Sequence, residues 1–197
     1  MAATAAPAAP RRDPVRRRAI LQAAATAFAH GGYAATSMEE IAAGAGVTKL
    51  IVYRHFGAKE TLYRALLEQV FERQAELFLA NLAQGLQAAG TTRALLDVAR
   101  EWPDGFRLVW RHAAREPQFA AEAEELREHA VRAARTIVEP FVAPAFAAWA
   151  AHTLFDQLVD AVLNWLDHGD PAHDDDFVEL ETAALRSTIA AWSNLRR

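Results

Sequence analysis

The chain has 197 residues, 52% of them hydrophobic and 23% charged, a composition that allows a buried core and excludes disorder throughout. It contains no cysteine, which excludes a disulfide scaffold, a thiolate zinc site and a cysteine nucleophile. The net charge of -4 hides an asymmetry, because residues 1–59 carry +5 and residues 60–197 carry -9, so only the N-terminal part suits a polyanion.

The first 14 residues are rich in alanine and proline and have nothing large to bury, which predicts a disordered tail over 1–14. Its apolar stretch precedes the first arginines, whereas a secretion signal begins with positive charge. The longest run without charge, 140–155, is broken by Pro144 and is shorter than the roughly 20 apolar residues of a spanning helix. We therefore expect a soluble, cytoplasmic protein without a membrane segment.

The remaining chain is dominated by alanine, leucine, arginine and glutamate and lacks the alternation of strands, which predicts an all-α fold. We predict a first helix over 15–30, which Gly31-Gly32 ends because glycine accepts the left-handed conformation. In the C-terminal part we expect breaks at 87–92, 102–105, 116–117 and 169–174, and long helices over 118–138, 146–168 and 175–196.

Residues 36–59 have the pattern of a helix-turn-helix. Thr36 and Glu39 fit a capping box at the start of a short helix. Gly46 permits a tight turn, and Thr48 caps the next short helix. Small residues before the turn let the two helices cross closely, so we expect the second helix to be held rigidly at the surface.

That second helix carries the chemistry that duplex DNA requires. The Thr48 hydroxyl can donate to a phosphate at a helix N-terminus, which itself favours anions. Lys49 can reach a phosphate or a guanine edge. Further donors and cations follow at Tyr53, Arg54, His55 and Lys59. The pattern favours a DNA-binding segment over a generic helical hairpin with core aromatics.

The stretch TSMEEIAAGAGVTKLIVYRHFGAKETL, residues 36–62, resembles the DNA-binding signature of tetracycline-repressor (TetR) type transcriptional regulators. The preceding AILQAAATAFAHGGYAATS resembles the first helix of that family. The resemblance implies a homodimer with a helix-turn-helix DNA-binding domain over 15–60 and a helical effector-binding and dimerisation domain over 61–197. It also implies that Thr36 and Thr48 contact phosphates and that Lys49 faces the groove. Tyr53, His55 and Lys59 would clamp phosphate.

One position departs from the family pattern, which often has glycine after the position of Lys49. Leu50 stands there in this chain, and it could contact a thymine methyl group or pack against the first helix. The full set expected at DNA is Thr36, Ser37, Thr48, Lys49, Leu50, Tyr53, Arg54, His55 and Lys59.

The predicted helix 146–168 is apolar on most of its sides and must be buried on most of them. We hypothesise that it and the last helix pair with their copies in a four-helix dimer interface, the alternative being packing within one subunit. The residues assigned to this interface are Leu154, Leu158, Val162, Trp165, Leu185, Ile189 and Trp192.

Aromatic residues cluster in the middle of the C-terminal part, where helix ends could open a pocket for a small, largely apolar effector. The alternative is that these rings fill the core. The residues assigned to the pocket are Trp102, Phe106, Trp110, Phe119, His152 and Phe155. We expect no metal or cofactor, because the acidic run after His173 lacks the spacing of a calcium loop.

The sequence therefore predicts a ligand-responsive transcriptional regulator and not an enzyme. It would be a repressor that the effector releases from a near-palindromic double-stranded DNA operator. Two alternatives stay open at this stage: a constitutive helical DNA-binding protein without an effector, and a helical metal-dependent enzyme.

Overall fold

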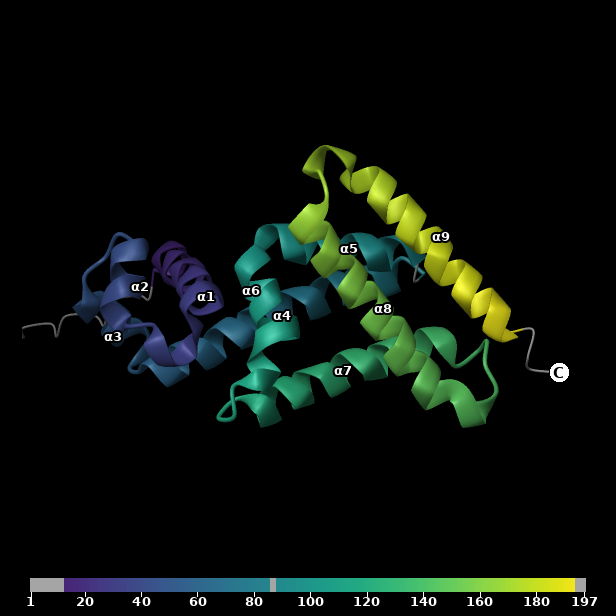
Figure 1. Cartoon of the computed structure of the whole chain (residues 1–197), viewed down its shortest axis with the longest axis horizontal. Helices are drawn as coiled ribbons and strands as arrows, with labels where there is room; N and C mark the ends of the chain where they lie inside the picture. Colours follow the sequence, from purple (N-terminus) through teal and green to yellow (C-terminus); the bar gives the residue numbers. More distant parts are fainter. Residues whose placement is uncertain (1–12, 86–87, 194–197) are drawn as a thin grey trace, which may run out of the picture.

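The computed structural model describes residues 13–85 and 88–193, and it contains no strand within those ranges (Figure 1). The predicted all-α fold is confirmed. Three helices, α1 (Pro14–Ala35), α2 (Met38–Gly44) and α3 (Lys49–Phe56), form what we call the head. Helix α4 (Lys59–Ala83) runs from the head into the rest of the molecule, which we call the body.

The body continues through α5 (Ala88–Glu101), α6 (Pro103–Arg107), the short turns η1 (Leu108–His112) and η2 (Ala113–Arg115), α7 (Ala120–Val138), η3 (Pro144–Phe146), α8 (Ala147–His168), η4 (Pro171–His173) and α9 (Asp174–Ser193). Helices α7 and α8 pack closely, and α9 crosses α5 and α8 (Figure 1). No helix in the described part is long and apolar enough to cross a membrane.

Helix α1 begins one residue earlier than predicted. Asp13 is its N-cap, whose carboxylate accepts from the amide of Val15 at 3.1 Å, and Pro14 occupies the first turn, where proline is tolerated. The predicted tail otherwise lies outside the described residues. Gly32, with φ of +75°, kinks the helix where it was predicted to end, and helical backbone continues beyond it to Ala35.

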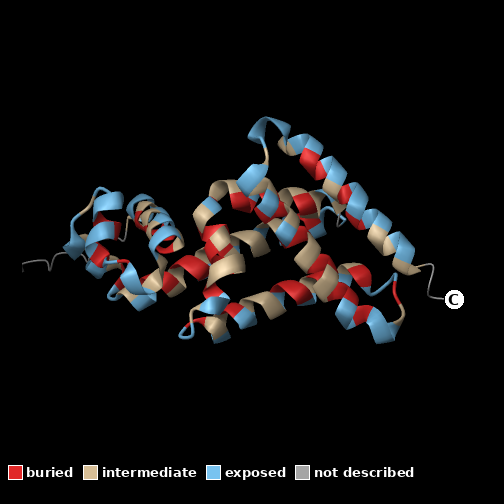
Figure 2. Cartoon of the chain, in the orientation of Figure 1, coloured by how far each residue is buried: buried red, intermediate tan, exposed pale blue. Residues whose placement is uncertain are grey.

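The head closes around a small apolar core. Ile20 and Phe28 of α1 meet Ile41 of α2 and Val52 of α3, all of them buried (Figure 2). Gly44 allows α2 to approach α1, because a Cβ atom at this position would lie 3.3 Å from the Cβ of Ala23. The second and third helices are therefore fixed against the first.

An aromatic cluster joins head and body. Tyr63 of α4 stacks on Phe119 with ring centroids 4.1 Å apart. Tyr63 also contacts Phe28 and Tyr33 of α1, and Phe119 contacts Tyr33. Burial raises the pKa of the Tyr63 hydroxyl. The predicted boundary at residue 60 falls in the first turn of α4, so one continuous helix belongs to both parts.

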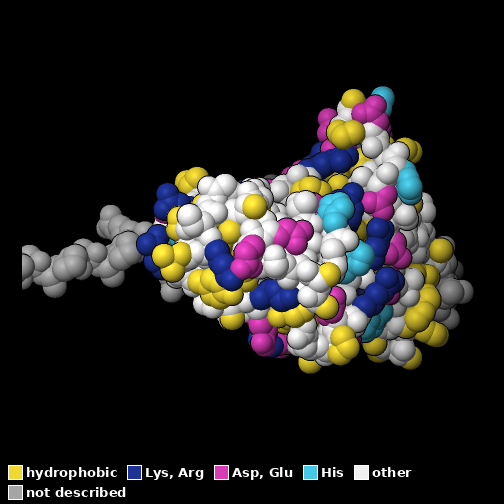
Figure 3. Space-filling view, turned by 60° about the vertical axis from the view of Figure 1, so that its left-hand side comes forward, with side chains coloured by type: hydrophobic (Ala, Val, Ile, Leu, Met, Phe, Trp, Pro, Cys, Tyr) yellow, Lys and Arg dark blue, Asp and Glu magenta, His cyan; other side chains and the backbone are white. Residues whose placement is uncertain are grey.

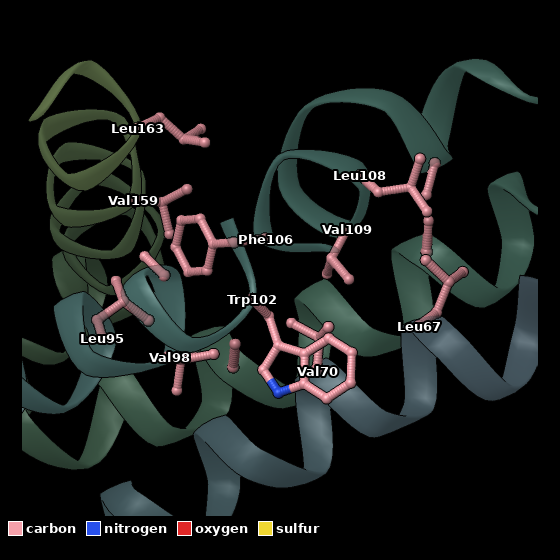
Figure 4. Close-up of a cluster of buried hydrophobic side chains, with 14 of the residues drawn as sticks. Leu67, Val70, Leu95, Val98, Trp102, Phe106, Leu108, Val109, Val159 and Leu163 are labelled. Carbon is pink, nitrogen blue, oxygen red and sulfur yellow. The ribbon is translucent and has the colours of Figure 1, made fainter. Parts of the chain in front are cut away.

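The core of the body lies where α4, α5, α6 and α8 meet (Figure 4). Trp102 and Phe106 point into it beside Val98 and Val159. The predicted break at 116–117 is confirmed, because η2 ends at Arg115 and α7 begins at Ala120. The break predicted over 102–105 is confirmed only at Trp102, because α6 begins at Pro103. The break predicted over 87–92 is wrong from Ala88 on, since α5 begins there, and residue 87 lies outside the described part.

Candidate nucleic-acid interface and effector cavity

The turn between α2 and α3 is built by backbone geometry. Gly46 has a φ of +65°, which favours glycine, and the amide of Val47 donates to the carbonyl of Ala42 at 3.0 Å. Helix α2 is capped by Ser37, whose Oγ accepts from the amide of Glu40 at 3.1 Å. The predicted helix-turn-helix is therefore present, but the expected capping box of Thr36 and Glu39 is wrong.

Thr36 points inward instead of toward solvent. Its side chain is buried, with 2% exposed, and its hydroxyl donates toward the carbonyls of Gly32 at 2.8 Å and Ala27 at 3.0 Å. The carbonyl of Gly32 also accepts from the amide of Thr36 at 3.4 Å, so both the backbone and the hydroxyl of Thr36 bind the end of α1. The expectation that Thr36 contacts a phosphate is wrong for this conformation, and Ser37 is the exposed neighbour.

Helix α3 has one face buried in the head and an opposite face exposed to solvent. Val52 and Phe56 are buried against α1 and α2, whereas Leu50 is 76% exposed and Tyr53 40% exposed. Arg54 is exposed beside them. The alternative that Leu50 packs against α1 is therefore wrong. The exposed side chains mix a hydroxyl, a guanidinium and apolar surface, which suits contact with phosphates and base edges.

The N-terminus of α3 is open to an anion. Thr48 is exposed and makes no side-chain cap bond to the helix, so its hydroxyl and the first amides face solvent. Lys49 pairs with Glu39 of α2, and its ammonium lies 5.5 Å from the centre of the Tyr53 ring. The hydrogen bond between Lys49 and Glu39 lowers the pKa of Glu39 and raises the pKa of Lys49. Figure 3 shows basic and apolar side chains together at this end of the molecule.

Lys59 serves the fold of the head. Its ammonium donates to the carbonyls of Tyr33 at 2.8 Å, Thr36 at 2.9 Å and Ala34 at 3.3 Å, and lies 4.4 Å from the centre of the Tyr33 ring. A cation at a helix C-terminus is favoured there by the helix dipole. The expectation that Lys59 clamps a phosphate is wrong in this conformation, because its three donors are engaged. His55 is half-buried beside Phe56.

The body contains a cavity of about 1120 Å³ between α4, α5, α7, α8 and α9. Most of its lining is apolar, with Phe71, Phe78, Leu95, Ile137, Leu158 and Ile189 among the larger members. Exposed lining residues such as Leu79 and Phe141 mark its opening. Gln74 brings polarity to the wall, since its Oε1 is buried and accepts no hydrogen bond from the described residues. Such a cavity exceeds the usual size of a ligand pocket.

Comparisons with known proteins agree with this geometry. The family described as bacterial regulatory proteins, tetR family, matches residues 20–66. The transcriptional activator FasR of Mycolicibacterium smegmatis is 32% identical over 173 residues, which cover 83% of this chain and 78% of FasR. The chain belongs to the tetR family. This tetR regulator is therefore a protein that binds DNA and controls transcription.

Other relatives share parts of this tetR chain or its fold. The regulator RutR of Escherichia coli is 33% identical over 96 residues, covering 47% of this chain and 45% of RutR. A TetR-like regulator from a Rhodococcus species has a TM-score of 0.76 at 20% identity, covering 92% and 98% of the two chains. AibR, solved with isovaleryl coenzyme A and operator DNA, has a TM-score of 0.65 at 22% identity, covering 86% and 97%.

The effector residues predicted for this tetR protein lie mostly elsewhere. Phe155 alone of the six lines the cavity; Trp110 packs behind it with ring centroids 5.2 Å apart. Trp102 and Phe106 fill the body core, and Phe119 belongs to the aromatic cluster at the head. The sixth, His152, does not line the cavity either. Trp102, Phe106 and Phe119 are therefore core residues, as the alternative for these rings expects.

The predicted dimer residues also face their own subunit. Leu154, Leu158, Leu185 and Ile189 line the cavity. Val162 is fully buried, Trp165 stacks on Phe177 at 4.8 Å, and Trp192 contacts Trp149 at 5.1 Å. Within the single chain these apolar stripes surround a large internal space and the body core. The dimer interface assigned to them stays a prediction, and packing within one subunit stays the alternative.

Much of the cavity lining and one residue beside the DNA-facing helix were not predicted from the sequence, among them three polar or charged residues. Glu39 meets Lys49 only because the turn folds α2 back beside α3. Gln74 and Arg186 line the cavity from α4 and α9. The apolar pattern gave no signal for Arg186, because it shares a helix face with Ala190 and Ser193 and not with the stripe of Leu185 and Ile189.

Proposed function

We propose that the exposed face of α3, together with the N-terminus of α2, reads an operator in the major groove. The observation that supports this most is the outward set of Thr48, Lys49, Leu50 and Tyr53 on a helix whose opposite face is locked into the head core. Thr48 and the first amides of α3 would hold a phosphate. Leu50 would contact a thymine methyl group and Lys49 a guanine or phosphate.

The cavity is the proposed effector site, and two helices connect it to the head. Helix α4 contributes Phe71 and Gln74 to the cavity wall and Tyr63 to the aromatic cluster. Helix α7 lines the cavity with Ala130 and follows Phe119, which stacks on Tyr63. An effector that favours a different spacing of α4 and α7 would shift the heads away from their DNA-binding positions. The protein would then act as a repressor that the effector releases.

For the dimer we propose the outward faces of α8 and α9 in place of the inward stripes. Leu180 on α9 is 71% exposed, and the exposed Ala184 and Ala191 follow it on the same side. Two copies packed there would place two heads on one face of a duplex with half-sites about 34–36 Å apart. Light scattering of Leu180→Glu tests this proposal, because a charge at the interface centre should yield monomers.

The effector proposal is tested by blocking the cavity. A duplex selected by the protein from a random pool serves as operator, and fluorescence anisotropy reports its release by cell-extracted apolar compounds. Ala130→Trp, which projects a ring into the cavity, should bind the duplex but no longer respond. The control is Ala148→Trp at an exposed position of α8 outside the lining, which should respond like the parent. Equal responses of both variants would contradict a cavity effector.

A further inference from the structure

Arg186 lies on the face of α9 that lines the cavity. The lining residues of this helix are Leu185, Arg186, Ile189, Ala190 and Ser193, which recur at helical spacing. Among the described residues of the lining, Arg186 is the one with a permanent charge, and no aspartate or glutamate accompanies it. A guanidinium therefore stands at the exposed edge of an otherwise apolar wall.

Most other arginines in the described part of the body have carboxylate partners, and Arg115 and Arg132, which have none there, lie outside the cavity lining. Ion pairs join Arg93 to Asp175, Arg100 to Asp174, Arg107 and Arg111 to Asp167, Arg127 to Asp156, and Arg135 to Glu139. Arg186 makes no ion pair with a carboxylate of the described chain. Its five donors remain available to a molecule in the cavity, and their planar arrangement matches a carboxylate or a phosphate.

The apolar part of the cavity defines the other end of such a molecule. Phe71 to Leu79 on α4 and His129 to Ile137 on α7 each extend the lining along roughly 12 Å of helix axis. Each methylene buried there strengthens binding about fourfold. Most of the lining is apolar, so a long aliphatic chain fits it better than a polar metabolite. Its polar members besides Arg186 are Gln74, Thr91, His129, Thr136 and Ser193.

We propose that the effector is an anionic amphiphile, whose long aliphatic chain fills the cavity and whose anionic group binds Arg186 at the opening. This inference rests on the proposed function, which makes the cavity the effector site. Its anion could be the carboxylate of a free fatty acid or the phosphates of a fatty acyl thioester of coenzyme A. Both present the same chemistry to Arg186, a negative charge attached to an apolar chain.

Calorimetric titration of the full-length protein with three probes tests the proposal. Dodecanoate and dodecanoyl coenzyme A carry an anion, and dodecanol carries the same chain without charge. We expect at least one anionic probe to bind about tenfold more tightly than dodecanol, as a charge-assisted hydrogen bond allows. The anionic probe that shows this preference identifies the source of the anion.

Two arginine variants show whether the anionic probe contacts Arg186 or responds only to the overall charge of the protein. Arg186→Gln should bind the preferred anionic probe about tenfold more weakly and dodecanol unchanged. Arg132→Gln removes the same charge from an exposed position of α7 outside the lining and should behave like the parent. Chain-length dependence should persist in Arg186→Gln, because the cavity is intact.

The proposal is overturned if dodecanol binds as tightly as both anionic probes, if Arg186→Gln binds all probes like the parent, or if no probe binds. The effector cavity itself is judged by a different result, the response of Ala130→Trp to effectors. Dodecanol that binds the parent but not Ala130→Trp would keep the cavity as the effector site while excluding the anionic group. The two failures are therefore distinguishable.

Discussion

The two lysines of the chain should have opposite roles, although both lie in the helix-turn-helix region. The ammonium of Lys59 donates to three carbonyls at the end of α1 and lies over the Tyr33 ring, whereas Lys49 is exposed on α3 and pairs with Glu39. Replacing each by methionine keeps the length of the side chain and removes the charge. Lys59→Met tests the fold of the head, and Lys49→Met tests the contact with DNA.

The magnitude for Lys59→Met follows from its contacts. A hydrogen bond from a charged group contributes about 1.5–3 kcal/mol, and a cation over an aromatic ring about 0.5–1 kcal/mol. These terms are not additive, and the side chain is half-buried, so we expect a loss of about 2 kcal/mol in the free energy of unfolding. For a chain of this size the unfolding temperature should then fall by about 4–8 °C.

Thermal unfolding and operator binding of both variants form the assay. Lys49→Met should unfold at the temperature of the parent, because an exposed ion pair contributes little, but bind its selected duplex about tenfold more weakly. Lys59→Met should be the less stable protein. The reasoning is refuted if Lys59→Met keeps the parental unfolding temperature and loses DNA affinity as Lys49→Met does, since Lys59 would then be a phosphate contact.

Three further variants probe other charges and polar groups. Glu39→Gln should raise operator affinity about threefold to tenfold at low salt, by removing a negative charge near the phosphates and releasing Lys49, and anisotropy titrations at two salt concentrations would show the gain fading. Gln74→Leu should raise the free energy of unfolding in urea by about 1 kcal/mol, because it removes a buried acceptor without a partner in the described chain. Asp174→Asn should lower that free energy by about 1–2 kcal/mol at pH 7, because the carboxylate binds Arg100 at 2.6 Å and 2.9 Å. The Arg100 guanidinium lowers the pKa of Asp174, so this stabilisation is present above the unfolded pKa of about 3.9 and disappears as the pH falls through the lower folded value.

Each of these variants has a contradicting result. Weaker operator binding by Glu39→Gln would show that the carboxylate orients Lys49 for DNA. A loss of stability in Gln74→Leu would show that the amide supports the wall of the cavity. A difference between Asp174→Asn and the parent that stays constant from pH 7 to pH 3 would exclude the titration of this carboxylate as its cause.

The local features of the head could be read from the sequence because they depend on neighbouring residues. The turn between the two short helices has a positive φ at Gly46, a conformation that favours glycine, so the glycine in the sequence indicates the turn. The spacing of Val52 and Phe56 assigns one face of α3 to the core. Thr36 was misassigned because the kink at Gly32 directs its hydroxyl back to α1. Adjacent Thr36 and Ser37 compete for the cap, and the conformation of α1 decides between them.

The body was less predictable because its arrangement depends on contacts between distant segments. The apolar stripes of α8 and α9 indicated burial correctly, but a stripe does not reveal whether it faces a second subunit or an internal cavity. Leu158 and Ile189 face the cavity because α4 and α7 stand opposite them. Lys59 likewise finds its carbonyls at residues 33–36, more than 20 positions earlier in the chain.

The contact between α3 and DNA is tested most directly by photo-crosslinking at two matched leucines. Leu50 on α3 and Leu82 on α4 are both exposed, at 76% and 46%. Each is replaced by a photoreactive benzoylphenylalanine, and the protein is irradiated on its selected duplex. We predict a crosslink to DNA from position 50 and none from position 82. A crosslink from position 82 with none from position 50 would contradict the assignment of α3 as the DNA-reading helix.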